Sequence, residues 1–379
     1  MSAPADPLPK GTAHVNGTAP SRRRRRAGAS MTERERVGAA LRREPTDRVP
    51  FGEFLVEDGL VRALAGLAPG APITFATHSR VLADLGQDAV VGYPATRDGR
   101  PLHGVHLGAG QGGREPRACD PLARFGLPQP DELDWGPLRA WVEDSPFFTF
   151  AMLPGPFSEL LYLLGTEDFL ALTLRDPVVA ARLAEGMVDY ALDLARRAHE
   201  LGAEGFLVGD DIAWHRGLYL SPASWRGIFL PALRREMEAL RDLGVPVVLH
   251  SDGNLTEVLE DWAGLGADGL HGLQSSAGMD LASLKLRFGS RLCLWGNVDM
   301  QDIADASRHE LDQVLHAIFT TGNATPGFIF GSSAGDLGVD LPAERVRETY
   351  ELANRLRDLP PAPLDPPAVM PAASGGAGR

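Results

Sequence analysis

The sequence predicts an α/β protein, a single (β/α)8 TIM barrel, over residues 31–358. Eight short apolar runs lie along this stretch, and they are continuous rather than alternating, as in parallel strands that are buried on both faces. Helical patterns, with apolar residues three and four positions apart, lie between most of them. No long linker rich in Pro, Gly or Ser divides the stretch, so we expect one domain.

The expected strands are short and most are followed by turn residues. In chain order they cover residues 49–54, 88–93, 147–153, 205–211, 245–250, 269–274, 292–297 and 327–333. One long amphipathic helix is expected from Pro177, and another after Ser221, a candidate N-cap that is followed by proline. Residues 94–146 are Gly-rich in the middle and predict a long irregular insertion.

Both ends of the chain differ in composition from the barrel. Residues 1–30 hold six basic residues, five of them in the run "RRRRR", against one acidic residue; their net charge of +5 leaves −18 for the rest of a chain of net charge −13. We interpret them as a disordered basic tail, because no apolar segment follows the arginines as an export signal requires. Met31 is a second candidate for the start of the protein. Residues 359–379, rich in Pro and Ala, are expected to form another disordered tail.

The composition excludes several classes of protein. With 44% apolar and 23% charged residues, the chain is an ordinary globular protein. Its acidic barrel is unsuited to nonspecific nucleic-acid binding, and no apolar run has the length of a membrane span. Two cysteines, Cys119 and Cys293, provide no disulfide framework, so we expect a cytoplasmic location. The oligomeric state stays open, with a homodimer as one option.

Polar residues gather where the expected strands end. Active sites of TIM barrels lie at the carboxyl ends of the strands, and six of the eight expected strands end in polar or ionisable groups, while the third ends in the turn "PGPF" and the second at Tyr93. Turns alone favour Asp, Asn and Gly at such positions, but the near-complete ring favours a shared cleft. Its members are Glu53, Asp210, Asp211, His250, Asp252, Gln274, Asn297, Asp299, Ser332 and Ser333, with Arg216 as the one arginine expected nearby.

Five stretches of the chain follow one another in order and at consistent spacing. They are "TERERVGAALRREPTDRVPF", "PGPFSELLYLLGTEDFL", "GDDIAWHRGLYLSPASW", "LHSDGNLTEVLEDWAGLGADGL" and "GMDLASLKLRFGSRLCLWGNVD". Together they resemble the uroporphyrinogen decarboxylase superfamily, which includes cobalamin-linked methyltransferases. The resemblance covers roughly residues 31–355 and implies an enzyme, and the motifs are specific to the superfamily and not to one reaction.

The sequence departs from the porphyrinogen decarboxylases in the loop that binds their substrate. Those enzymes resemble one another in an arginine-rich loop after the first strand, which holds the acidic side chains of the tetrapyrrole. Here the same place reads "FGEFLVEDG", with Glu53, Glu57 and Asp58. Carboxylates would repel an octa-anionic tetrapyrrole, so a haem-pathway substrate is not expected.

The sequence also departs from the thiol-specific zinc methyltransferases of the superfamily. These carry His-x-Cys after the fifth strand and a distant Cys after the eighth. His250 matches the histidine, but Asp252 replaces the first cysteine, and Ser332 and Ser333 stand near the second. Cys293 is no substitute, because it lies near the start of the seventh expected strand, at the wrong end of a barrel. The resemblance therefore implies a harder site of imidazole and carboxylate, suited to zinc or another divalent metal.

The first functional hypothesis is metal-assisted methyl transfer. His250 and Asp252 would hold the metal, completed by Asp210 or Asp211, of which only one can face the barrel axis because neighbouring strand residues alternate. We expect Asp211 to orient the second ring nitrogen of His250, and His271 to be a core histidine. The resemblance implies a small O- or N-methylated substrate. The acceptor would be a corrinoid on a separate protein, because no cobalamin-binding motif occurs in the chain.

Two further hypotheses stay open. The protein could be a cofactor-independent decarboxylase or lyase of a small acid, with Asp210, Asp211 and His250 handling protons. It could also be a binding barrel without catalysis. In each case the remaining ring residues are expected to bind the small-molecule substrate or ligand: Glu53, Arg216, Gln274, Asn297, Asp299 and Ser332.

Overall fold

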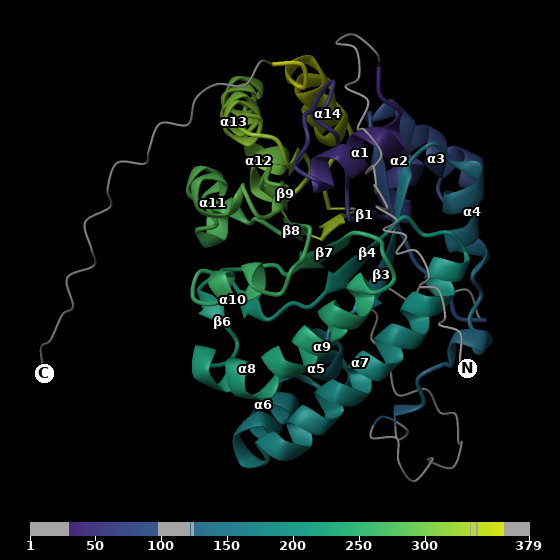
Figure 1. Cartoon of the computed structure of the whole chain (residues 1–379). Helices are drawn as coiled ribbons and strands as arrows, with labels where there is room; N and C mark the ends of the chain where they lie inside the picture. Colours follow the sequence, from purple (N-terminus) through teal and green to yellow (C-terminus); the bar gives the residue numbers. More distant parts are fainter. Residues whose placement is uncertain (1–29, 98–121, 123–124, 334, 339, 360–379) are drawn as a thin grey trace, which may run out of the picture. The chain divides into compact units, whose positions relative to one another are not determined.

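Parallel strands form a curved sheet that helices surround (Figure 1). The computed structural model describes residues 30–97, 122, 125–333, 335–338 and 340–359. The sheet has seven strands in the order β10-β9-β8-β7-β4-β3-β2. Their bounds are β2 Ala89–Gly92, β3 Phe148–Pro154, β4 Gly205–Gly209, β7 Val247–His250, β8 Gly269–His271, β9 Cys293–Trp295 and β10 Phe328–Ile329.

The first expected strand, residues 49–54, closes the barrel through two single bridges. Phe51 pairs with Phe330 after β10, and Gly52 pairs with Ala89 of β2, both in parallel. Beyond Gly52 the chain leaves the barrel, and β1 (Leu55–Val56) pairs with β11 (Asp336–Leu337). The predicted (β/α)8 class is confirmed, with shorter strands than the apolar runs suggested. A small antiparallel hairpin, β5 (Ala213–Trp214) and β6 (Gly217–Leu218), was not expected.

Helices follow the strands, as the class requires. They are α1 Glu33–Leu41, α2 Asp58–Leu64, α3 Phe75–Asp84, α4 Gly136–Asp144, α5 Ser158–Leu164, α6 Thr166–Arg175, α7 Pro177–Glu200, α8 Pro222–Ile228, α9 Leu230–Arg241, α10 Leu259–Ala263, α11 Leu281–Phe288, α12 Met300–Asp305, α13 Arg308–Gly322 and α14 Ala343–Leu356. Short 3-10 turns cover Pro130–Glu132 and Ser275–Ala277.

Capping residues and prolines explain where two of the predicted helices begin and break. The side chain of Asp176 accepts a hydrogen bond from the Val179 backbone, so α7 starts at Pro177 as expected. The helix expected after Ser221 is two helices, α8 and α9, because Pro231 lacks a backbone donor and cannot lie inside a continuous helix.

Two apolar layers surround the strands. The inner cluster fills the barrel with side chains such as Phe150, Leu207 and Trp295, and Val37 and Leu41 of α1 pack against it. A larger outer cluster lies between the strands and the surrounding helices. The neighbours Val90 and Val91 of β2 belong to different clusters, as the alternation of side chains along a strand requires.

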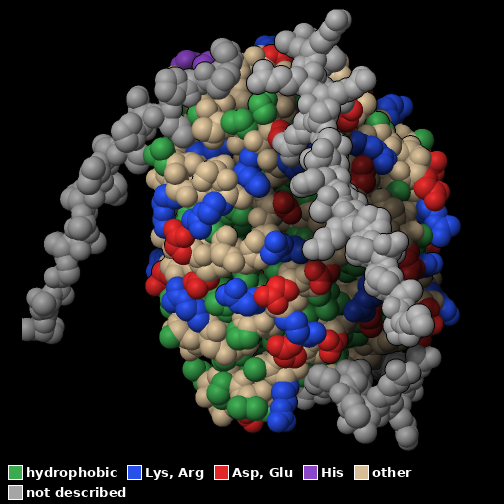
Figure 2. Space-filling model, in the orientation of Figure 1, with side chains coloured by type: hydrophobic (Ala, Val, Ile, Leu, Met, Phe, Trp, Pro, Cys, Tyr) green, Lys and Arg blue, Asp and Glu red, His purple; other side chains and the backbone are tan. Residues whose placement is uncertain are grey.

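The surface carries both signs of charge. On the face in Figure 2, Lys and Arg side chains are interspersed with Asp and Glu. Within the described part of the chain, no helix combines the length and the apolar character needed to cross a membrane. The expected tails, apart from Ser30 and Leu359, and the middle of the expected insertion, residues 98–121 with 123 and 124, fall outside the described residues.

Candidate functional site

Three side chains converge at the carboxyl end of the barrel. His250 is the last residue of β7, Asp252 follows it, and Asp211 lies two residues beyond β4, the neighbouring strand. The Nε2 atom of His250 lies 3.6 Å from Asp211 Oδ1 and 3.9 Å from Asp252 Oδ1. One ligand atom from each residue lies within 4.8 Å of the other two. The structure thus brings His250 and Asp252 together with Asp211 rather than Asp210.

The donor atoms of this triad fit a divalent cation. One imidazole nitrogen and two carboxylate oxygens suit zinc and harder divalent ions. Asp252 Oδ1 is buried and has no hydrogen-bond partner among the described residues. Gly335 lies beside the imidazole, where an added Cβ atom would be 3.7 Å from His250 Nε2, an ordinary contact distance. The Asp252 backbone donates to Asp211 Oδ1 at 2.8 Å, which holds that carboxylate toward the triad.

The electrostatics of the triad are negative. Burial, opposed by the attraction of His250 and aided by the charge of Asp211, raises the pKa of Asp252 to about 6. Asp336 of β11 lies close enough that His250 and Asp211 influence its pKa, which burial and Glu57 raise. No arginine or lysine among the described residues forms an ion pair with Asp211, Asp252 or Asp336.

Asp210 points away from the triad and supports a turn. Its Oδ1 accepts hydrogen bonds from the backbones of Phe157 at 2.8 Å and Ser158 at 2.9 Å, at the start of α5. The turn before α5 packs so tightly that a Cβ atom on Gly155 would lie 2.3 Å from the Asp210 Cβ. Burial raises the pKa of Asp210 to about 7, although the two backbone donors oppose the rise. The geometry gives Asp210 a structural contact and leaves Asp211 for chemistry.

A second histidine, His271, completes the surroundings of His250. The two Nδ1 atoms lie 2.7 Å apart, because β7 and β8 pair these residues in register. Burial and the neighbouring His250 lower the pKa of His271 well below its ordinary value. The prediction that Asp211 orients the second nitrogen of His250 is wrong: Asp211 faces Nε2, and His271 faces Nδ1. His271 is also not a satisfied core residue, because its Nε2 is buried without a partner in the described chain.

Hydrogen bonds between Glu53 and Ser332 connect the first expected strand, residues 49–54, to the residues after β10. The Glu53 carboxylate accepts hydrogen bonds from the Ser332 backbone at 2.8 Å, from the Ser332 hydroxyl and from the Tyr350 hydroxyl. Burial raises the pKa of Glu53 to about 7, and these donors limit the rise. The three side chains therefore form a buried hydrogen-bond network beside the mouth of the barrel, the opening at the carboxyl ends of its strands.

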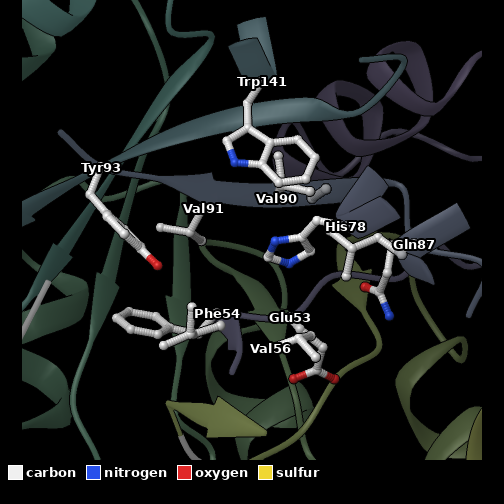
Figure 3. A pocket seen from close by; sticks show the side chains of 12 residues that line it. Glu53, Phe54, Val56, His78, Gln87, Val90, Val91, Tyr93 and Trp141 are labelled. Carbon is white, nitrogen blue, oxygen red and sulfur yellow. The ribbon is translucent and has the colours of Figure 1, made fainter. Parts of the chain in front are cut away.

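A narrow pocket lies where the first strand separates from β2 (Figure 3). Glu53, His78, Tyr93 and Trp141 line it together with apolar side chains. Phe54 lines the same pocket and also contacts His250, with ring centroids 4.8 Å apart. Phe54 is thus shared between the pocket and the triad.

The remaining predicted site residues brace loops or lie outside the triad. Gln274 Oε1 accepts from the Gly253 backbone at 3.2 Å, in the loop after β7. The Asn297 amide donates to the Leu273 carbonyl at 2.8 Å. Asp299 accepts from the Gln301 backbone at 3.0 Å and caps α12. Arg216 is exposed on the β5–β6 hairpin, 5.9 Å from the ring of Trp214.

Known proteins share the sequence and the fold of this chain. The uroporphyrinogen decarboxylase (URO-D) family matches residues 143–356, more than half of the chain. A uroporphyrinogen decarboxylase of Xanthomonas campestris pv. campestris is 26% identical over 86% of this chain and 99% of its own. One of Syntrophotalea carbinolica is 27% identical over 53% of this chain and 57% of its own. A methyltransferase from Methanosarcina mazei has a similar fold, with a TM-score of 0.66 and 18% identity over 86% of this chain and 99% of that chain.

Proposed function

The chain belongs to the uroporphyrinogen decarboxylase family, and we propose that the protein is a metal-assisted methyltransferase within it. The methyl donor is a small O- or N-methylated molecule, and the acceptor is a corrinoid on a separate protein or another nucleophile. The observation that carries the proposal is the convergence of Asp211, His250 and Asp252 at the carboxyl end of the barrel.

The three side chains of the triad would together bind the metal. His250 Nε2 and one oxygen each of Asp211 and Asp252 would hold zinc or another divalent metal, which when bound acts as a Lewis acid on the methylated oxygen or nitrogen. The bond from the methyl carbon to that atom breaks with its electron pair staying on the oxygen or nitrogen, while the acceptor's electron pair forms the new bond to carbon. Phe54 packs against His250 and limits the orientations that the imidazole can take.

The charge around the triad favours neutral or cationic methyl donors. Asp336 and Glu57 add negative charge beside Asp211 and Asp252. The hydroxyls of Tyr162 and Tyr219 lie within electrostatic reach of the same two aspartates, and burial together with these charges raises the pKa of both tyrosines. A methoxy compound or a methylated amine suits this environment better than an acidic substrate.

A second candidate is a metal-independent decarboxylase of a small acid. The names of the curated relatives favour it, and so does Asp252, whose pKa of about 6 suits a proton donor near neutral pH. The two candidates differ in their need for metal. Carbon dioxide release that persists with a chelator supports the decarboxylase, and chelator-sensitive methyl transfer supports the methyltransferase.

The experiment that tests the proposal measures metal and methyl transfer on the same protein. We expect purified protein loaded with Zn²⁺ to hold one ion per chain by elemental analysis, and His250→Ala to hold none. His215→Ala removes an exposed histidine of the nearby hairpin and serves as the matched control, with wild-type metal content. Loss of the cob(I)alamin absorbance with a panel of methoxy and methylamine donors reports methyl transfer. No stoichiometric metal in the wild type, together with turnover unaffected by chelation, would reject the proposal.

A further inference from the structure

The contact between His250 and His271 constrains where their protons lie. A neutral imidazole has one donor nitrogen and one acceptor nitrogen. Two Nδ1 atoms 2.7 Å apart therefore need a proton on one and a lone pair on the other. If His271 donates, the proton of neutral His250 lies on Nε2, and that nitrogen cannot bind a cation. If His250 donates, its Nε2 lone pair faces Asp211 and Asp252.

Among the described residues, His271 makes no side-chain hydrogen bond other than the one to His250. Its side chain is fully buried, and its Nε2 has no partner within the described residues. The rings of Phe54 and Trp295 pack around it, with centroids 5.9 and 4.8 Å away. Close packing continues at Gly272, where an added Cβ atom would lie 2.3 Å from the Ser251 carbonyl and 3.1 Å from His250 Nδ1. His271 is therefore held with its Nδ1 toward His250.

We propose that His271 is a positioning residue, whose Nδ1 accepts the Nδ1 proton of His250 and so leaves the Nε2 lone pair of His250 toward the triad. This inference rests on the proposed cation site. Histidine ligands of metals usually donate their second N–H to a carboxylate, a carbonyl or water. A neutral imidazole adds no negative charge, so a cation bound by Asp211, His250 and Asp252 stays more electrophilic than it would with a carboxylate in the place of His271.

Two substitutions at one position separate positioning from packing. His271→Asn removes the ring but keeps an oxygen acceptor near the place of Nδ1, whereas His271→Leu fills the volume without an acceptor. We expect the Zn²⁺ affinity of His271→Leu to fall roughly 10- to 100-fold, as for other lost partners of ligand histidines, and that of His271→Asn to stay close to wild type. Equal losses in both variants, or a Leu variant that is folded and binds Zn²⁺ as tightly as wild type, would overturn the inference.

The nitrogen-15 NMR spectrum of protein with isotope-labelled histidines gives a second measurement, which does not depend on the Zn²⁺ affinity. In the Zn²⁺ form we expect a protonated Nδ1 on His250 and a protonated Nε2 on His271. If the wild type binds no divalent metal and its turnover is unaffected by a chelator, the proposed function is rejected, and the histidine pair is then judged in the metal-free protein. There, a hydrogen-bonded Nδ1–Nδ1 pair supports the positioning role. Two rings that each average between tautomers contradict it.

Discussion

Asp210 and Asp211 are neighbours in the chain with different surroundings. Asp210 accepts two backbone hydrogen bonds at the start of α5, and Asp211 lies beside His250. Adjacent residues at a strand end point to opposite sides, so this difference follows from the backbone. A buried, structural carboxylate and a candidate metal ligand thus stand side by side in the sequence.

Alanine substitutions should separate these two roles. Asp210→Ala leaves two buried backbone donors without an acceptor, and we expect the free energy of unfolding to fall by about 3 kcal/mol, with Zn²⁺ affinity retained in the folded protein. Asp211→Ala should lower Zn²⁺ affinity at least about 100-fold, the upper end of the losses seen for outer-shell changes, with a smaller effect on stability. Urea unfolding and Zn²⁺ titration provide the two measurements. Loss of Zn²⁺ binding in a stable Asp210→Ala protein would contradict the assignment.

Glu53 should make the stability of the protein depend on pH. Its ordinary pKa is 4.5, and burial raises the pKa in the folded protein to about 7. Below pH 4.5 both states are protonated. Between pH 4.5 and 7 the unfolded chain ionises while the folded protein keeps its proton, so the folded state loses stability as pH rises, by about 3 kcal/mol in total. Above pH 7 the loss is complete and constant.

Replacing Glu53 by Gln removes this titration. Relative to wild type, Glu53→Gln should therefore gain about 3 kcal/mol in the free energy of unfolding between pH 4 and pH 8. The exposed Glu238→Gln variant is the control and should follow wild type. Parallel pH curves for wild type and Glu53→Gln would show that the pKa of Glu53 is the same in the folded and the unfolded protein, and would contradict the prediction.

At the scale of elements, the apolar runs of the sequence predicted where the strands lie. They did not predict which residues of neighbouring strands pair with each other. All eight expected runs coincide with barrel strands or bridges, because a strand buried on both faces needs a continuous apolar segment. The two-residue pieces β1, β5, β6 and β11 are too short to show a period. His271 was misjudged for a related reason. Its place opposite His250 follows from the register of β7 and β8, which the sequence does not encode locally.

Cys293, at the start of β9, should contribute to stability and take no part in metal binding or catalysis. Cys293 was expected at the end of the barrel opposite the site, and it is fully buried as the first residue of β9. Burial raises the pKa of its thiol to about 12, so the reactive thiolate is suppressed. Cys293→Ser should lower the free energy of unfolding by about 2 kcal/mol, because it buries a hydroxyl among apolar side chains. Cys293→Ala should lower it less, and neither variant should change Zn²⁺ content. Loss of metal from a folded variant would place the site elsewhere.

At the scale of the whole molecule, the negative charge at the mouth of the barrel should exclude the strongly anionic substrates of the porphyrinogen decarboxylases. Where porphyrinogen decarboxylases carry arginines, this chain has Glu53, Glu57 and Asp58. In the structure Glu53 is buried in a network, while Glu57 lies near Asp336 and adds to the negative charge beside the triad. Arg216 is exposed on a hairpin against Trp214 and forms no ion pair with the triad in the described part of the chain. Among the described residues, an octa-anionic tetrapyrrole would therefore meet Asp211, Asp252 and Asp336 with no lysine or arginine paired to them.

We expect uroporphyrinogen to be no substrate, with no coproporphyrinogen detected by fluorescence after chromatography. Among small methoxy compounds, a carboxylate-bearing donor should have a kcat/KM at least about 10-fold below that of its neutral analogue at low salt, since about 1.4 kcal/mol of repulsion produces that ratio. The ratio should shrink as ionic strength rises, because salt shortens the Debye length from about 30 Å at 0.01 M to about 8 Å at 0.15 M. Preference for the carboxylate at low salt, or tetrapyrrole turnover lost in His250→Ala, would show that the mouth attracts acids and would favour the decarboxylase.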